Sequence, residues 1–143
     1  MTAPSHDSHQ EAAAAPRPGE RTALKVPARS AYLGLVRMVV AAVAAAADFS
    51  VDDIEDLRMA ADEAAALMMS GAHRDAVLHL MIEVGQHDLA ISVTAPSTGV
   101  AISTDSFAWT VLSTLADTAE HTTQGETTTI AVTKGRGDEL PLS

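Results

Sequence analysis

The 143-residue chain contains no cysteine and no asparagine, and aromatic residues make up only 3% of it. Without cysteine there is no disulfide framework, no thiolate metal site and no cysteine nucleophile. The chain therefore needs no oxidising compartment, and we expect a cytoplasmic protein. Its most apolar run, residues 38–47, is about half as long as a membrane-spanning helix, so we expect no membrane span.

Basic residues are scarce, with 9 Lys and Arg against 19 Asp and Glu, which gives a formal net charge of −10. Nucleic-acid binding depends on Lys and Arg contacts to phosphate, so this charge excludes direct DNA binding and favours a basic protein partner. The six histidines are dispersed and form no helical pair at metal-ligand spacing. We therefore expect no metal site.

The chain divides into one domain and two short ends. Residues 1–20 are small, polar and interrupted by proline, and we expect a disordered N-terminal tail. Residues 21–136 carry the periodic apolar pattern of a single domain, and residues 137–143 form a C-terminal tail. With 47% hydrophobic residues, a chain of this length can bury a substantial core.

Helical periodicity of apolar residues predicts three helices. The first has Ser30 as its N-cap and runs to about residue 47; the second is capped by Ser50 and runs to residue 70; the third covers residues 106–119. Asp53 would complete a capping box with Ser50, and Gly71 would be a left-handed stop. The expected apolar stripes are Val36, Val39, Val40, Val43 and Ala47 in the first helix, Leu57, Ala60, Ala61, Ala64, Leu67 and Met68 in the second, and Phe107, Val111, Leu112 and Leu115 in the third.

Strand-like alternation predicts strands over residues 21–26, 77–84, 89–93 and 127–133, with a tight turn at residues 85–88. Helices that each carry one apolar stripe, combined with an antiparallel hairpin, indicate an α+β fold. We expect a two-layer α/β sandwich with a mixed, mainly antiparallel sheet and helices on one face.

Two segments of the chain resemble a known family. Residues 49–64 and residues 111–117 are similar to the second and third helices of the anti-sigma factors of the bacterial general-stress and sporulation switches. The resemblance covers about residues 21–134, and residues 107–109 look like an actinobacterial branch. It implies a histidine-kinase/Hsp90-like ATPase fold and a serine-protein kinase that uses MgATP.

The resemblance assigns a general base and a magnesium ligand to the second helix. Glu63 matches the family's catalytic glutamate, and on a helical wheel it lies roughly 100° from the centre of the apolar stripe. Leu67 stands where the family has the asparagine that holds Mg²⁺. Leucine has no oxygen donor for a hard cation, and the chain contains no asparagine that could take its place.

Two further ATP motifs of the family are altered. Ala95 replaces the aspartate that binds the adenine amine, and Gly99 is what remains of the glycine-rich turn after it. Ser106 and Ala108 stand where the family has the two glycines that approach the phosphates. These losses predict weak or absent ATP use, that is, a pseudokinase.

The protein-binding part of the resemblance is retained. Arg37 matches, by its spacing to Glu63, a first-helix arginine with which the family contacts both the sigma factor and the antagonist. Tyr32 and Leu33 could add apolar anchor area, although Leu33 also suits the core. The resemblance further suggests a homodimer formed through the sheet.

The sequence therefore predicts an anti-sigma factor that sequesters a stress or developmental sigma factor and is released by an anti-anti-sigma antagonist. One alternative is an active serine/threonine kinase that phosphorylates this antagonist with Glu63 as base. A second is a sensor of another nucleotide, such as a cyclic dinucleotide, because Phe107 and Trp109 adjoin the altered glycine positions.

Overall fold

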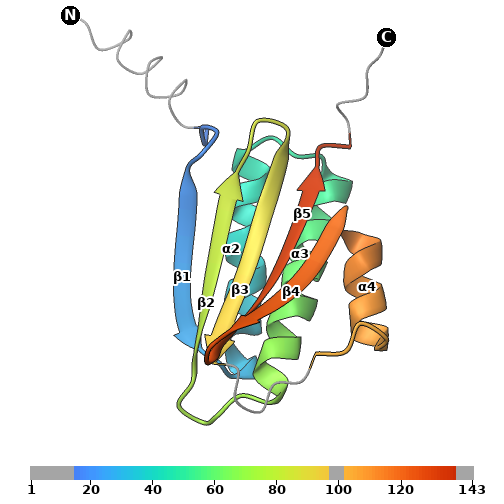
Figure 1. Cartoon of the computed structure of the whole chain (residues 1–143). Coiled ribbons are helices and arrows are strands. Elements are labelled where there is room, and N and C mark those ends of the chain that lie inside the picture. Colours follow the sequence, from blue (N-terminus) through green and yellow to red (C-terminus); the bar gives the residue numbers. More distant parts are fainter. Residues whose placement is uncertain (1–14, 97–101, 138–143) are drawn as a thin grey trace, which may run out of the picture.

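The computed structural model describes residues 15–96 and 102–137. Three α-helices lie on one face of a five-stranded sheet (Figure 1). The elements are β1 (Arg21–Pro27), the short 3-10 helix η1 (Ser30–Tyr32), α2 (Leu33–Ala46), α3 (Val51–Ser70), β2 (Val77–Val84), β3 (Asp88–Pro96), α4 (Phe107–Leu115), β4 (Thr118–Gln124) and β5 (Thr127–Gly135).

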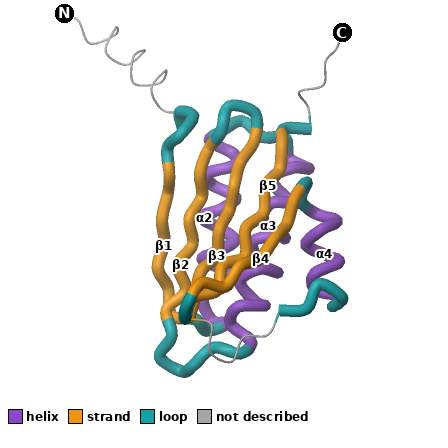
Figure 2. Tube along the Cα trace, in the orientation of Figure 1, coloured by secondary structure: helices purple, strands orange, loops and turns teal. Residues whose placement is uncertain are grey.

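The strand order in the sheet is β1-β2-β3-β5-β4, and every neighbouring pair is antiparallel. The predicted two-layer α/β sandwich is confirmed, with a sheet that is antiparallel throughout. Figure 2 shows β5, the last strand of the described residues, inserted between β3 and β4. The helices cover one face of the sheet, and no helix of the described residues covers the other.

The core follows from the two-residue period of the strands. Leu80 and Ile82 of β2, Ile91 of β3 and Ile130 of β5 are at most 1% exposed, and their sequence neighbours point to the other face. Each such side chain contributes about 1.5–3 kcal/mol when it leaves water. The helices complete the core with small residues, and the side chains of Ala60, Ala61, Ala64 and Ala65 on α3 are buried.

The helix boundaries partly follow the predicted caps. Ser50 accepts a hydrogen bond from the backbone N–H of Asp53 at 3.1 Å, as expected for the N-cap of α3. Ser30, by contrast, begins η1, and α2 starts at Leu33 without a side-chain cap. The helix α3 does end at Ser70, but Gly71 has φ −114°, so the predicted left-handed stop is wrong.

The carboxylate of Asp53 does not complete a capping box, because it binds the end of β5 instead. It accepts a hydrogen bond from the backbone N–H of Gly137 at 2.8 Å, and Nζ of Lys134 lies 3.9 Å away. Arg136 reaches the same region: its Nη1 donates to the carbonyl of Ala47 at 2.8 Å, and its guanidinium lies 4.8 Å from the centre of the Phe49 ring. These contacts, which we call the β5 clasp, fix the end of β5 to the α2–α3 connection.

The third predicted helix is too long, and the strand after it was missed. The helix α4 ends at Leu115 because Ala116 is already extended, with φ −115° and ψ 161°, and the N–H of Asp117 bonds to the carbonyl of Thr133 at 2.8 Å. The strand β4 then follows in the segment that the helix prediction partly covered. Its β-branched threonines pack well on a pleated surface, and Thr118 and Thr123 bond through their hydroxyls to threonines of β5.

Two smaller expectations also fail. The sequence predicts that Phe107 lies on the buried stripe of the third helix, but its side chain is 82% exposed. The sequence predicts that residues 17–20 belong to the tail, whereas they form a turn in which the N–H of Gly19 donates to the carbonyl of Val84 at 2.7 Å. Gly137, expected in the C-terminal tail, is held by the hydrogen bond from its N–H to Asp53. Residues 1–14 and 138–143 of the expected tails lie outside the described part. Within the described residues, no helix has the length and apolar character needed to span a membrane.

Candidate functional site

Glu63, the candidate general base, lies in the second half of α3, next to the buried Ala64, and its side chain is half-buried. No hydrogen bond or ion pair engages its carboxylate within the described residues. Its neighbour Asp62 is in a different situation, because it accepts a hydrogen bond from Nη1 of Arg37 at 2.8 Å. The carboxylate of Glu63 is therefore available to accept a proton, but its position alone defines no reaction.

Leu67 lies one turn further along α3 and packs against the hydrophobic core. Ile102, before α4, and Leu115, at the end of α4, are likewise half-buried and packed against this core. The position at which the family has its magnesium ligand is thus part of an apolar contact surface. No group of three or more His, Asp or Glu side chains that could hold a metal ion occurs among the described residues.

Ala95, at the position of the adenine-binding aspartate, is the last buried residue of β3 and is 2% exposed. Its side chain is an enclosed methyl group, which has no hydrogen-bond acceptor for the adenine amine. Gly99 lies outside the described residues.

Ser106 is the N-cap of α4, and its hydroxyl is used twice. It accepts from the N–H of Trp109 at 3.1 Å and donates to the carbonyl of Ser103 at 2.9 Å. Ala108 is half-buried, and the Trp109 ring packs edge-to-face against His121 with 5.2 Å between the centroids. The entry to α4 is therefore organised by side-chain capping, not by bare glycine backbone.

These positions do not fit MgATP. Of the five that the structure describes, only Glu63 and Ser106 carry a side-chain oxygen, and that of Ser106 is occupied in the cap. Mg²⁺ requires oxygen ligands in an octahedral arrangement, usually a carboxylate or amide together with phosphates and water. The arrangement supplies neither this ligand nor the adenine acceptor.

Arg37 is half-buried between α2 and α3, and it is the only charged residue of α2. Its guanidinium lies over Gly34, where an added Cβ would be 3.7 Å from Nη2. Tyr32 and Leu33, proposed as apolar anchors, are half-buried and pack against the core. The structure therefore brings Arg37 to the α2–α3 boundary and gives Leu33 mainly a packing role.

The outer side of α2 is apolar and open, which the sequence reasoning missed. Leu35 is 39% exposed and Met38 is 65% exposed. Ala42 and Ala45, nearer the end of the helix, are also exposed. Met59, on α3, is 44% exposed. A helix that is apolar on all sides is normally covered on all sides, so the near absence of charge in α2 was the available signal.

The outer side of α3 is charged, in contrast to that of α2. Glu55 and Arg58 form an exposed ion pair one turn apart, with 2.6 Å between Oε1 and Nη2. The hydrogen bond from Arg58, and then its positive charge, lower the pKa of the Glu55 carboxyl below its ordinary value. The pKa of Arg58 is raised by the same contacts. The Arg37–Asp62 pair is a second ion pair of α3, and it lies at the boundary with α2.

Comparison with known proteins places this fold. No family model matches the chain. Among curated proteins, "Serine-protein kinase RsbW" from Bacillus cereus (strain B4264) is 30% identical, and that from Bacillus anthracis (strain A0248) is 29% identical. Each match covers 82 residues, which are 57% of this chain and 51% of the relative, so the chain spans about half the length of these relatives.

A solved structure agrees with this similarity. The chain resembles the structure of the RsbU and RsbW domains of Rv1364c from Mycobacterium tuberculosis with a TM-score of 0.61 at 16% identity, over 80% of this chain and 32% of that one. The fold is thus the one expected for the histidine-kinase-like ATPase class. The resemblance to the anti-sigma factor and serine-protein kinase family is confirmed over the matched residues; the actinobacterial branch stays a prediction.

Proposed function

We propose that this chain is an anti-sigma factor that sequesters a stress or developmental sigma factor and is released by an anti-anti-sigma antagonist. The observation that carries the proposal is the open apolar side of α2, bordered by Arg37, on a domain in which Leu67 and Ala95 pack where the family has its magnesium and adenine contacts. Leu35 and Met38 would supply contact area, and Arg37 would supply a bidentate contact to a carboxylate of the partner.

Charge supports a basic partner. The net charge of −10 attracts a protein with a positive surface and speeds its association. A sigma factor carries such a surface where it binds DNA, so sequestration would compete with DNA binding. The proposal places both proteins in the cytoplasm.

In this proposal ATP use is lost or weak. Catalysis of phosphoryl transfer rests almost entirely on positioning and on metal electrostatics. Leu67 and Ala95 provide neither, and control would then lie in competition between two protein partners for one surface. Homodimerisation through the uncovered face of the sheet is part of the proposal, and small side chains such as Ala90, Ser92 and Ala131 on that face would allow close approach.

The binding arm of the test uses pull-downs and titrations with candidate sigma factors at physiological salt. Met38→Glu should abolish or strongly weaken the complex, because it places a charge in the apolar contact. Val51→Glu is the matched control, since Val51 is 75% exposed and lies at the start of α3, not on α2. Absence of a complex with every candidate, or equal effects of the two variants, would contradict the proposal.

The nucleotide arm uses isothermal titration with MgATP and a non-hydrolysable analogue. We expect no detectable heat of binding. Tight, magnesium-dependent binding would instead favour the second candidate function, a serine kinase acting on the antagonist. The half-buried, unengaged carboxylate of Glu63 and the naming of the relatives as serine-protein kinases favour this alternative. Phosphate transfer that is lost in folded Glu63→Ala would establish it.

A further inference from the structure

The positive side chains of this acidic protein are not evenly paired. All nine Lys and Arg residues lie within the described part. Five of them have acidic or carbonyl partners, namely Arg21, Arg37, Arg58, Lys134 and Arg136. The side chains of Arg17, Lys25, Arg29 and Arg74 have no such partner among the described residues. Three of these four lie at one end of the sheet, where β1 ends and β2 begins.

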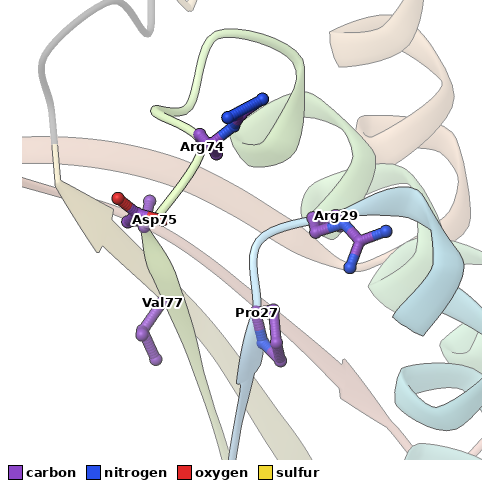
Figure 3. Close-up of a pocket in the computed structure, with 6 residues that line it drawn as sticks. Pro27, Arg29, Arg74, Asp75 and Val77 are labelled. Atoms are coloured by element: carbon purple, nitrogen blue, oxygen red, sulfur yellow. The ribbon is translucent and has the colours of Figure 1, made fainter.

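A concavity of about 560 Å³ lies at this end. It is lined by the last residue of β1, the first residue of β2 and residues of the β1–η1 and α3–β2 connections, namely Pro27, Arg29, Arg74, Asp75, Ala76 and Val77 (Figure 3). The N–H of Ala28 donates to the carbonyl of Ala76 at 2.9 Å and ties the two connections together. An adjoining hollow of about 470 Å³ shares Arg74, Asp75 and Ala76 and adds His73 and Pro96. Both volumes are in the range of small-molecule sites.

The charges around the concavity favour an anion. In Figure 3 the guanidinium of Arg74 lies over the α3–β2 connection and that of Arg29 lies beside η1, and the carboxylate of Asp75 points away from both. Lys25 stands two residues before Pro27 on the same face of β1. The two guanidiniums and the single carboxylate of the lining leave a local charge of about +1, which attracts the negative charge of a phosphate monoester near pH 7.

We propose that this concavity binds the phosphate group of a small phosphate monoester. Arginine guanidiniums offer paired N–H donors that fit phosphate oxygens, and such charge-assisted bonds are stronger than neutral ones. Neither guanidinium has to break an existing ion pair to bind the ligand. Glu63, Leu67 and Ser106 line neither hollow, whereas Pro96 of the second hollow directly follows Ala95, the position of the adenine-binding aspartate.

The test is an NMR titration of the ¹⁵N-labelled full chain with glycerol 2-phosphate, with chloride used to hold the ionic strength constant. We expect saturable shifts of the Arg29 and Arg74 side-chain Nε–H signals and of the Ala76 amide. The double variant Arg29→Gln with Arg74→Gln should weaken binding at least about tenfold, since both charged contacts are removed. Asp75→Asn should tighten binding severalfold, because it removes the opposing charge.

Two controls separate this site from general attraction of anions. Arg21→Gln removes a cation of β1 that already pairs with Glu83. Arg17→Gln removes an unpaired cation that lies outside the concavity. Both variants should leave the affinity for the phosphate monoester unchanged. Because Arg29 and Arg74 are exposed, the variants should fold normally, and their NMR spectra check this. Absence of saturable shifts, equal losses in the control variants, or equal binding of a carboxylate probe such as citrate would overturn the proposal.

Discussion

The guanidinium of Arg37 on α2 is joined to the carboxylate of Asp62 on α3 by a hydrogen bond of 2.8 Å, with the two side chains 37% and 30% exposed. The one cation of α2 is therefore already bound within the chain, beside the apolar surface that we propose for partner binding. A partner carboxylate that uses Arg37 has to displace Asp62 or share the guanidinium with it.

This competition gives the first prediction. If a partner contacts Arg37, Asp62→Asn should raise its affinity about threefold to fivefold, because a partly exposed ion pair of this kind is worth up to about 1 kcal/mol. Surface plasmon resonance or calorimetric titration with the partner measures the change.

The control for Asp62 is Glu55→Gln, which removes one negative charge from the same helix but acts on the Arg58 pair. It should leave the affinity nearly unchanged at physiological salt. An equal gain in both variants would mean that net charge, not release of Arg37, governs binding. No gain in Asp62→Asn, when Arg37→Ala weakens binding, would show that Asp62 does not compete.

Restoring the family's asparagine should not restore the cofactor. In Leu67→Asn an amide replaces a half-buried side chain that packs against the core, and the free energy of unfolding should fall by about 1–2 kcal/mol. Urea unfolding measures this loss, and calorimetry with MgATP should still show no binding because Ala95 remains. Recovery of ATP binding from this single change would contradict the account of the closed site.

The β5 clasp predicts a stability difference between two adjacent aspartates. Asp53→Ala should lower the free energy of unfolding by about 2 kcal/mol, because the N–H of Gly137 and the ammonium of Lys134 lose a buried acceptor. Asp52→Ala, in the same first turn of α3 but exposed, should cost less than about 1 kcal/mol through the helix dipole alone. Similar losses in the two variants would contradict the clasp.

The placement of α4 predicts that its most exposed apolar residue contributes little to stability. Phe107→Ser should change the free energy of unfolding by less than about 0.5 kcal/mol, since the ring is 82% exposed. Leu112→Ala, on the buried side of the same helix, should cost about 2–5 kcal/mol. Thermal or urea unfolding followed by circular dichroism distinguishes the two. A large loss of stability in Phe107→Ser would instead support the prediction that Phe107 lies on a buried apolar stripe.

The sequence predicted the long, strongly periodic elements and missed those that depend on partners far along the chain. The alternation in residues 77–84 and the Ser50 cap are local signals, and both are found in the structure. β4 is different: its small and threonine-rich sequence has no strong period, and its strand conformation comes from pairing with β5. The helix prediction for residues 116–119 failed for this reason, since tertiary pairing overrode a weak local preference.

For the candidate site, the sequence located positions but not their environments. It identified Leu67 and Ala95 as substitutions, and only the structure shows that both now pack against apolar neighbours or are enclosed. It also found Arg37 from its spacing to Glu63. The pairing of Arg37 with Asp62 joins residues 25 positions apart on two helices, and no local pattern reports such a contact.

The position of β5 between β3 and β4 has a consequence for synthesis. While the ribosome has delivered only the residues up to the end of α4, β3 has no neighbour on one side, and Asp53 has neither Gly137 nor Lys134 beside it. The unpaired edge of β3, a strand with a buried apolar face, thus stays open in the nascent chain until β5 emerges. Such an open edge can pair wrongly with other chains. Cooperative folding of this domain can finish only after translation has passed Gly137.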